Sequence, residues 1–194
     1  VGVIANQPMH LAGTLDVKAC EKMSHFLALC DAYGLPVISF VDVPGFFVGL
    51  EAEKSGIARK ASRLVHEIGS LTVPLFSVTI RKGYGMGYLA MGGGRTLGAN
   101  LCVAWPNAQI AAMSVEGAVD TVFRGPDDVG DAQLRTERIL ELSNTTGAVA
   151  AAGAFAIDNL ILPDETRGVF ARAIAVAPPR RTTTLKGRRT LHPI

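Results

Sequence analysis

A buried strand that runs directly into a glycine-rich turn is the feature that most constrains this chain. Residues Val73 to Ile80 are apolar or β-branched apart from Ser77, and the next segment contains Gly83, Gly85 and Gly87 at alternate positions. Glycine lets a backbone turn sharply and lie close to a ligand, and the first N–H groups of a helix have no partner inside it. We therefore predict a strand, a tight turn and a helix start, with the amides of Met86 and Gly87 forming an oxyanion hole.

Other interpretations of these glycines remain open or are excluded. The glycines would suit close packing of a strand against a helix equally well, without any ligand. A dinucleotide-binding turn is not indicated, because Tyr88 stands where a G-x-G-x-x-G motif needs its last glycine. The sequence also contains no G-x-x-x-x-G-K-[ST] motif, so a P-loop is excluded.

The rest of the chain alternates between strand and helix patterns, which indicates an α/β fold. We expect strands at 1–5, 36–41, 73–80, 101–105 and 109–113 and helices at 16–33 and 54–68. Further helices are expected at 115–123, 127–142, 147–156 and 166–176. These elements predict one layered domain over residues 1–176, followed by a basic tail over 177–194. Because the chain opens directly on an apolar strand, we expect it to be a fragment or a split subunit.

Composition narrows the class of protein. The three cysteines are scattered and form no C-x-x-C pair, so neither a zinc site nor a disulfide framework is indicated. Cys20 and Cys30 fall on the apolar face of the helix at 16–33 and are expected in the core. The four histidines have no metal-ligand spacing, and no metal is expected. Without a long apolar run or a signal peptide, the sequence indicates a cytoplasmic protein and no membrane contact.

The net charge of +2 hides an uneven distribution. Five of the 19 basic residues and none of the 17 acidic ones lie in the 177–194 tail. That tail has no aromatic residue on which a base could stack, so we expect it to contact solvent or a partner subunit. No nucleic acid is expected as a partner.

Acid–base residues are hard to find beside the glycine turn. The chain has no G-x-S-x-G motif, and its serines have no base partner nearby in sequence. Glu53 and Glu116 are candidates for an acid and a base, although carboxylates near a helix start also favour the helix dipole. An oxyanion hole without a protein base suits a reaction in which a cofactor supplies the base.

Several motifs along the chain resemble one family, the carboxyltransferase β subunits of biotin-dependent acyl-CoA carboxylases, and in particular their C-terminal domain. The motifs are Val3-Ile4-Ala5-Asn6-Gln7-Pro8, Phe40-Val41-Asp42-Val43-Pro44-Gly45-Phe46, Arg81-Lys82-Gly83-Tyr84-Gly85-Met86-Gly87-Tyr88, Ala104-Trp105-Pro106-Asn107-Ala108 and Gly117-Ala118-Val119. The resemblance covers nearly the whole chain. It implies a crotonase-like α/β fold, a spiral of strand-strand-helix units with peripheral C-terminal helices.

The resemblance also assigns roles to residues. It implies that the Met86 and Gly87 amides face the ureido carbonyl of carboxybiotin, with the methionine side chain pointing away. It implies that Pro44, Gly45 and Phe46 shape the wall of the biotin pocket and that Tyr84, Gly85 and Tyr88 flank the hole. Leu89 aligns with a position that tunes acyl-chain choice, where aspartate is usual in propionyl-preferring members.

In the reaction that the resemblance implies, loss of CO2 leaves negative charge on biotin, and a biotin nitrogen removes the α-proton of an acyl-CoA. The resulting enolate captures CO2, so no protein base is needed. The expected partners are an N-terminal carboxyltransferase half, a biotin carboxylase and biotin carrier, and further copies in a trimer or hexamer. The same chemistry serves decarboxylases coupled to a sodium pump. A crotonase-like enoyl-CoA hydratase or isomerase and a non-catalytic assembly subunit are the alternatives.

Overall fold

The computed structural model describes residues 1–95, 97–122, 132–143 and 145–180. In these ranges a parallel sheet has the strand order β1-β2-β3-β4-β6, and β5 pairs with the end of β3. The strands are β1 (Gly2–Ala5), β2 (Val37–Val43), β3 (Leu75–Tyr84), β4 (Leu101–Ala104), β5 (Gln109–Ala111) and β6 (Asn159–Leu160). A parallel sheet crossed by helices is the α/β arrangement that the sequence predicts.

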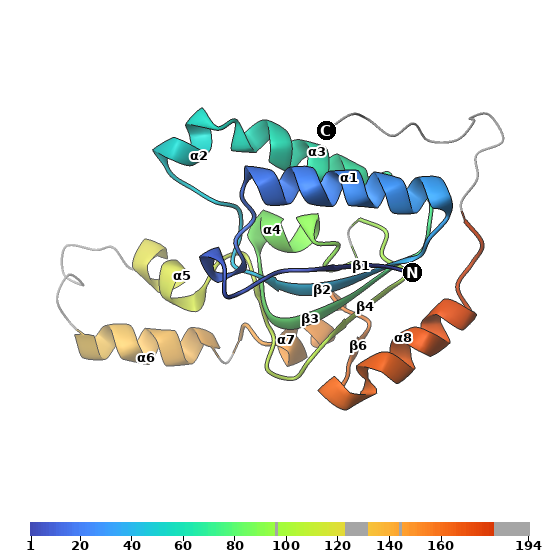
Figure 1. Cartoon of the computed structure of the whole chain (residues 1–194). Coiled ribbons are helices and arrows are strands. Elements are labelled where there is room, and N and C mark those ends of the chain that lie inside the picture. Colours follow the sequence, from blue (N-terminus) through green and yellow to red (C-terminus); the bar gives the residue numbers. More distant parts are fainter. Residues whose placement is uncertain (96, 123–131, 144, 181–194) are drawn as a thin grey trace.

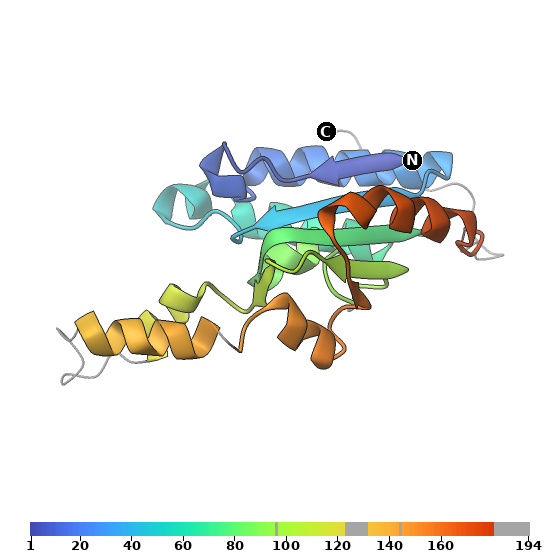
Figure 2. The same cartoon turned by 90° about the horizontal axis from the view of Figure 1, so that it is seen from below.

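Helices cover both faces of this sheet (Figure 1). The helices are α1 (Val17–Tyr33), α2 (Leu50–Lys54), α3 (Ile57–Gly69), α4 (Gly85–Ala90), α5 (Val115–Val122), α6 (Ala132–Ser143), α7 (Ala148–Gly153) and α8 (Thr166–Ala175). Helices α1, α3 and α4 pack on one face and α8 packs on the other, while α7 packs against Cys102 and Ala104 of β4, which point away from α8. Helices α5 and α6 extend away from the sheet (Figure 2).

Burial on both faces explains why the central strands are mostly apolar. Six of the seven residues of β2 are buried, with no alternation between apolar and polar positions. Val41 and Val43 belong to the core under α1 and α3, whereas Ile38 packs with Phe76 and Phe170 under α8. This pattern is typical of parallel strands that helices cover from both sides.

Local signals set the ends of the first helix as the sequence predicts. The Asp16 carboxylate accepts a hydrogen bond from the Ala19 amide at 2.7 Å, which satisfies one of the unpaired donors of the first turn. Gly34 follows the helix with a φ of 70°, the left-handed conformation that glycine adopts without steric cost. Cys20 and Cys30 are fully buried, which confirms their place in the core.

Several predicted bounds were wrong, each for a local reason. Strand β3 continues through the glycines to Tyr84, because β5 pairs with its last three residues. The helix expected at 54–68 is α3, which starts at Ile57 because its N-cap Gly56 has a φ of 77°, and the short helix α2 before it was missed. Strand β6 was missed, and the alanine-rich helix expected at 147–156 is shorter. Parts of the predicted 115–123 and 127–142 helices and most of the tail lie outside the described residues.

In the described ranges, no group of three or more histidine, cysteine, aspartate or glutamate side chains is arranged to hold a metal ion. Neither length nor hydropathy qualifies any helix of the described chain to span a membrane.

The buried thiols predict slow chemical modification. Burial raises the pKa of Cys20 to about 12 and raises the pKa of Cys30 and Cys102 as well. Because the thiolate is the reactive form, we expect all three thiols of the native chain to react with iodoacetamide at pH 8 at least about 100-fold more slowly than free cysteine. In guanidinium chloride all three should react. A native thiol that reacts as fast as free cysteine would contradict this packing.

Candidate functional site

The candidate site lies at the edge of the sheet where β1, β2 and β3 end. Parallel strands bring their carboxyl ends to the same edge, which is where α/β sheets commonly bind ligands. Asn6 follows β1, Pro44–Phe46 follow β2, and α4 begins at Gly85 directly after β3. The fold therefore brings the predicted pocket wall and the predicted oxyanion turn to the same edge.

A contact between two glycines joins these two segments. A methyl group on Gly87 would lie 2.8 Å from the Gly45 Cα atom and 3.1 Å from its carbonyl carbon. Gly45 itself has a φ of 141°, outside the range that residues with a side chain prefer. The loop after β2 therefore packs directly on the start of α4, backbone against backbone.

Two amides at the start of α4 have no partner outside the helix in the described part of the chain. They belong to Met86 and Gly87, at the second and third positions of a helix whose N-cap is Tyr84. The first N–H groups of a helix have no acceptor within it, so both donors are free for a ligand. Gly85 makes the turn with a φ of 54°, and a methyl group there would lie 2.8 Å from the Ala112 carbonyl oxygen.

The side chains of Met86 and Leu89, which both lie on α4, differ in burial. Met86 is 54% exposed, so its side chain extends into solvent, away from the core. Leu89 is half-buried and packs against the core under α1 and α3. The substrate-tuning role expected for Leu89 stays a prediction.

The two tyrosines of the turn are both buried. The Tyr84 hydroxyl donates a hydrogen bond to Gln109 Oε1, and burial, together with the nearby Glu116 carboxylate, raises its pKa. The Tyr88 ring fits into space that glycines leave open, since a methyl group on Gly83 would lie 2.7 Å from the ring. Its hydroxyl lies 3.8 Å from Cys102 Sγ, and burial raises its pKa. Tyr88 therefore flanks the turn through its backbone, and its side chain lies in the core.

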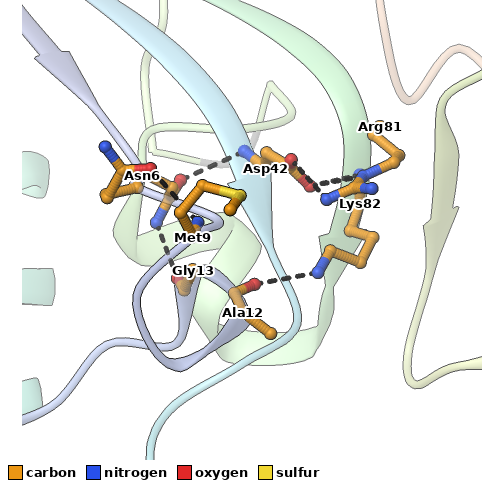
Figure 3. A network of polar contacts seen from close by, with 8 residues as sticks. Asn6, Met9, Ala12, Gly13, Asp42, Arg81 and Lys82 are labelled. Atoms are coloured by element: carbon orange, nitrogen blue, oxygen red, sulfur yellow. Dashed lines mark hydrogen bonds and ion pairs between the residues drawn. The ribbon is translucent and has the colours of Figure 1, made fainter.

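Sequence reasoning missed a polar network beside the site, which Figure 3 shows. Strand β3 has two extra residues opposite Asp42, because Val41 pairs with Thr79 but Val43 pairs with Gly83. Asp42 satisfies the groups that this bulge leaves unpaired. Its carboxylate accepts hydrogen bonds from the Lys82 amide at 3.2 Å and from the Arg81 guanidinium at 3.1 Å.

The sequence did hold a signal for this network. Asp42 is an acidic residue inside an apolar strand, and its side chain is only 9% exposed. A buried carboxylate requires partners, so basic residues at the end of a neighbouring strand were its natural candidates.

The two glutamates considered as acid and base are exposed. Glu53 lies on α2, after the pocket wall, and Glu116 lies in the first turn of α5. Glu116 is close enough to Tyr84 to raise the pKa of its hydroxyl. Nothing in the described structure brings the two carboxylates together.

The glycine contact predicts the effect of adding one methyl group. Gly87→Ala forces the Cβ atom against the Gly45 backbone, which has no flexible end that can move aside. We expect a loss of about 1–3 kcal/mol in the free energy of unfolding, measured by urea denaturation.

Gly153→Ala is the matched control for this measurement. Gly153 lies in α7, and a methyl group there would meet nothing within 4 Å. This variant should be as stable as the native chain or more stable by about 0.4–1 kcal/mol. Equal stability of Gly87→Ala and the native chain would show that the two backbones are not in contact.

Comparisons with known proteins identify the family to which the chain belongs. The family model for the carboxyl transferase domain matches residues 1–190. The propionyl-CoA carboxylase beta chain of Saccharopolyspora erythraea is 41% identical over 189 residues, which cover 93% of this chain and 34% of the relative. The methylmalonyl-CoA carboxyltransferase 12S subunit of Propionibacterium freudenreichii subsp. shermanii is 40% identical, covering 94% of this chain and 35% of the relative.

Solved structures show the same fold. A crystal structure of transcarboxylase 12S, a hexamer assembly with methylmalonyl-coenzyme A and methylmalonic acid bound, superimposes with a TM-score of 0.87. It is 36% identical, and the match covers 98% of this chain and 37% of the other. The chain thus spans about a third of the length of the relatives it matches. On sequence and fold together, it belongs to the carboxyl transferase domain family, with the crotonase-like fold of carboxyltransferase β subunits.

Proposed function

We propose that this chain forms the biotin-side half of an acyl-CoA carboxyltransferase. The observation that carries the proposal is the packing of Gly45 on Gly87, which places two free amides beside an open loop at the carboxyl edge of the sheet. The motif that contains these amides is the one that the family resemblance assigns to biotin. Membership of the carboxyl transferase family supports the same chemistry.

The residues present fit a biotin ring. A methyl group on Gly45 would meet nothing within 4 Å, so the loop leaves open space beside the start of α4 for the ureido ring. Pro44 and Phe46 are half-buried on either side of Gly45 and would form the apolar wall. The Tyr84 hydroxyl is occupied by Gln109, which leaves the backbone amides as the donors for a ligand oxygen.

In the proposed mechanism the chain contributes binding and charge stabilisation. The Met86 and Gly87 amides donate to the ureido oxygen and stabilise negative charge that develops there. When bound, carboxybiotin supplies the carboxyl group and then a nitrogen base for the α-proton of the acyl-CoA. Because that base comes with the cofactor, the exposed positions of Glu53 and Glu116 present no difficulty.

The surface around the site favours a partner. Apolar side chains that follow the ends of β1, β2, β3 and β5 are exposed, and they are Met9, Leu11, Phe47, Val48, Leu50, Met86 and Met113. Such a concentration at one edge marks an interaction surface. We propose that an N-terminal carboxyltransferase half, which would hold most of the acyl-CoA, covers this edge within a homo-oligomer. A subunit that carries biotin would deliver the cofactor to the same edge.

A transfer assay tests the split site. Carboxyl transfer from malonyl-CoA or methylmalonyl-CoA to free biotin should occur when the chain is combined with an N-terminal carboxyltransferase half. The chain alone should give no transfer, because the acyl-CoA has no complete site. The N-terminal half must first be shown to be active with another C-terminal domain. If that half gives no transfer with this chain, the proposal is contradicted.

Removing one amide tests the oxyanion hole. Met86→Pro deletes an N–H that α4 does not use, at a helix position where proline is tolerated. We expect a loss of transfer rate of about 100-fold, the typical effect of losing one oxyanion donor. Met86→Ala keeps the amide and removes only the exposed side chain, so its rate should stay within about threefold of the native value. Equal rates for the two variants would show that the amide is not used.

A further inference from the structure

A strained turn lies next to the proposed biotin wall. Leu11, Ala12 and Gly13 have φ values of 47°, 54° and 87°, so three successive residues adopt the left-handed conformation. Glycine tolerates this conformation, but leucine and alanine adopt it only where surrounding contacts impose it. Strain of this kind concentrates at ligand sites and switch regions. The contacts that hold the turn therefore point to its role.

Two side chains hold the turn through its carbonyl groups (Figure 3). The Lys82 ammonium donates to the Ala12 carbonyl oxygen at 2.8 Å, and Asn6 Nδ2 donates to the Gly13 carbonyl oxygen at 3.0 Å. Asn6 Oδ1 in turn accepts from the Asp42 amide at 3.1 Å. Gly13 fits closely against β2, because a methyl group there would lie 2.5 Å from the Asp42 carbonyl oxygen.

The turn is also connected to the loop that packs on α4. The Leu15 amide donates to the Gly45 carbonyl oxygen at 3.1 Å, and the Phe47 amide donates to the Leu15 carbonyl oxygen at 2.9 Å. These two bonds attach the segment after the turn to both sides of Phe46, as a short parallel bridge. A shift of the turn would therefore move Gly45 relative to Gly87.

Among the residues that contact the turn, Lys82 is the one best placed to control its conformation. Its bond to Ala12 lies at the surface and spans 70 residues of sequence, so it joins β3 to the turn without a large apolar contact. Loss of such a contact loosens the local segment more than the whole fold. The backbone of Lys82 remains fixed by Asp42, whatever its side chain does.

We propose that Lys82 is a positioning residue for the biotin wall. By holding the Ala12 carbonyl, its ammonium fixes the strained turn and, through Leu15, the position of Gly45 beside the two amides. The inference rests on the proposed function, because the wall matters only if biotin binds there. It assigns no contact between Lys82 and the cofactor itself.

Lys82→Met tests the proposal, because it keeps the length of the side chain and removes its charge. Hydrogen exchange measures how firmly the turn is held, and it does not require an active enzyme. We expect the Leu15 and Phe47 amides to exchange about tenfold faster in Lys82→Met than in the native chain. In the transfer assay with the N-terminal half, the KM for free biotin should rise about five- to tenfold, while kcat stays within about threefold. A purely structural role would not raise KM while leaving kcat nearly unchanged.

Two further variants make the test specific. Lys82→Arg can still donate to the Ala12 carbonyl, so it should restore most of the exchange protection and of the KM. Lys22→Met removes an exposed lysine on α1 and should change neither quantity. Circular dichroism should show the same helix content in all three variants.

The outcomes separate this proposal from the proposed function. Unchanged exchange at Leu15 and Phe47 in Lys82→Met would overturn the positioning role, whatever the activity. Faster exchange with an unchanged KM would also overturn it, because the turn would then not act on the biotin wall. Absence of transfer by the native chain with a competent half would instead overturn the proposed function, and with it the role of this turn in binding biotin.

Discussion

The contact between the Gly45 and Gly87 backbones is the constraint on which the rest of the site depends. It lets the loop after β2 and the helix after β3 approach more closely than any side chain allows. The free amides of α4 then lie beside the apolar wall of Pro44 and Phe46 and are not covered by it. A methyl group on Gly87 would separate the two segments, whereas Gly45 requires glycine for its φ of 141°.

Polar side chains satisfy backbone groups that this geometry leaves without a partner. Strand β3 has to bulge opposite Asp42 to bring its glycines to the right place, and a bulge leaves backbone groups unpaired. The Asp42 carboxylate accepts from one of them and from Arg81, while Asn6 accepts from the Asp42 amide. The same network continues to the strained turn at 11–13. Strand, wall and turn are thus joined through hydrogen bonds and not only through apolar packing.

Local chemistry explains which parts of the fold could be predicted. Asp16 and Gly34 set the ends of α1 by themselves, so the sequence was sufficient there. The end of β3 was missed because pairing with β5 overrides the turn preference of Gly83, and no local pattern reports that pairing. The start of α3 at Ile57 was missed because glycine permits the left-handed φ that Gly56 adopts but does not require it. The start of a helix at Gly85 was predictable, whereas the inward direction of the Tyr88 side chain depends on Gly83 and Gly93, which leave room for its ring.

The central claim is that the Met86 and Gly87 amides receive the ureido oxygen of biotin. Titration of the selectively 15N-labelled chain with free biotin, followed by NMR, tests it most directly. The account predicts that the Met86 and Gly87 resonances move together and saturate, with smaller changes at Gly45 and none at Gly153 in α7. Saturable changes confined to another surface would contradict the account, as would Met86 and Gly87 signals that stay unchanged when the N-terminal half is also present.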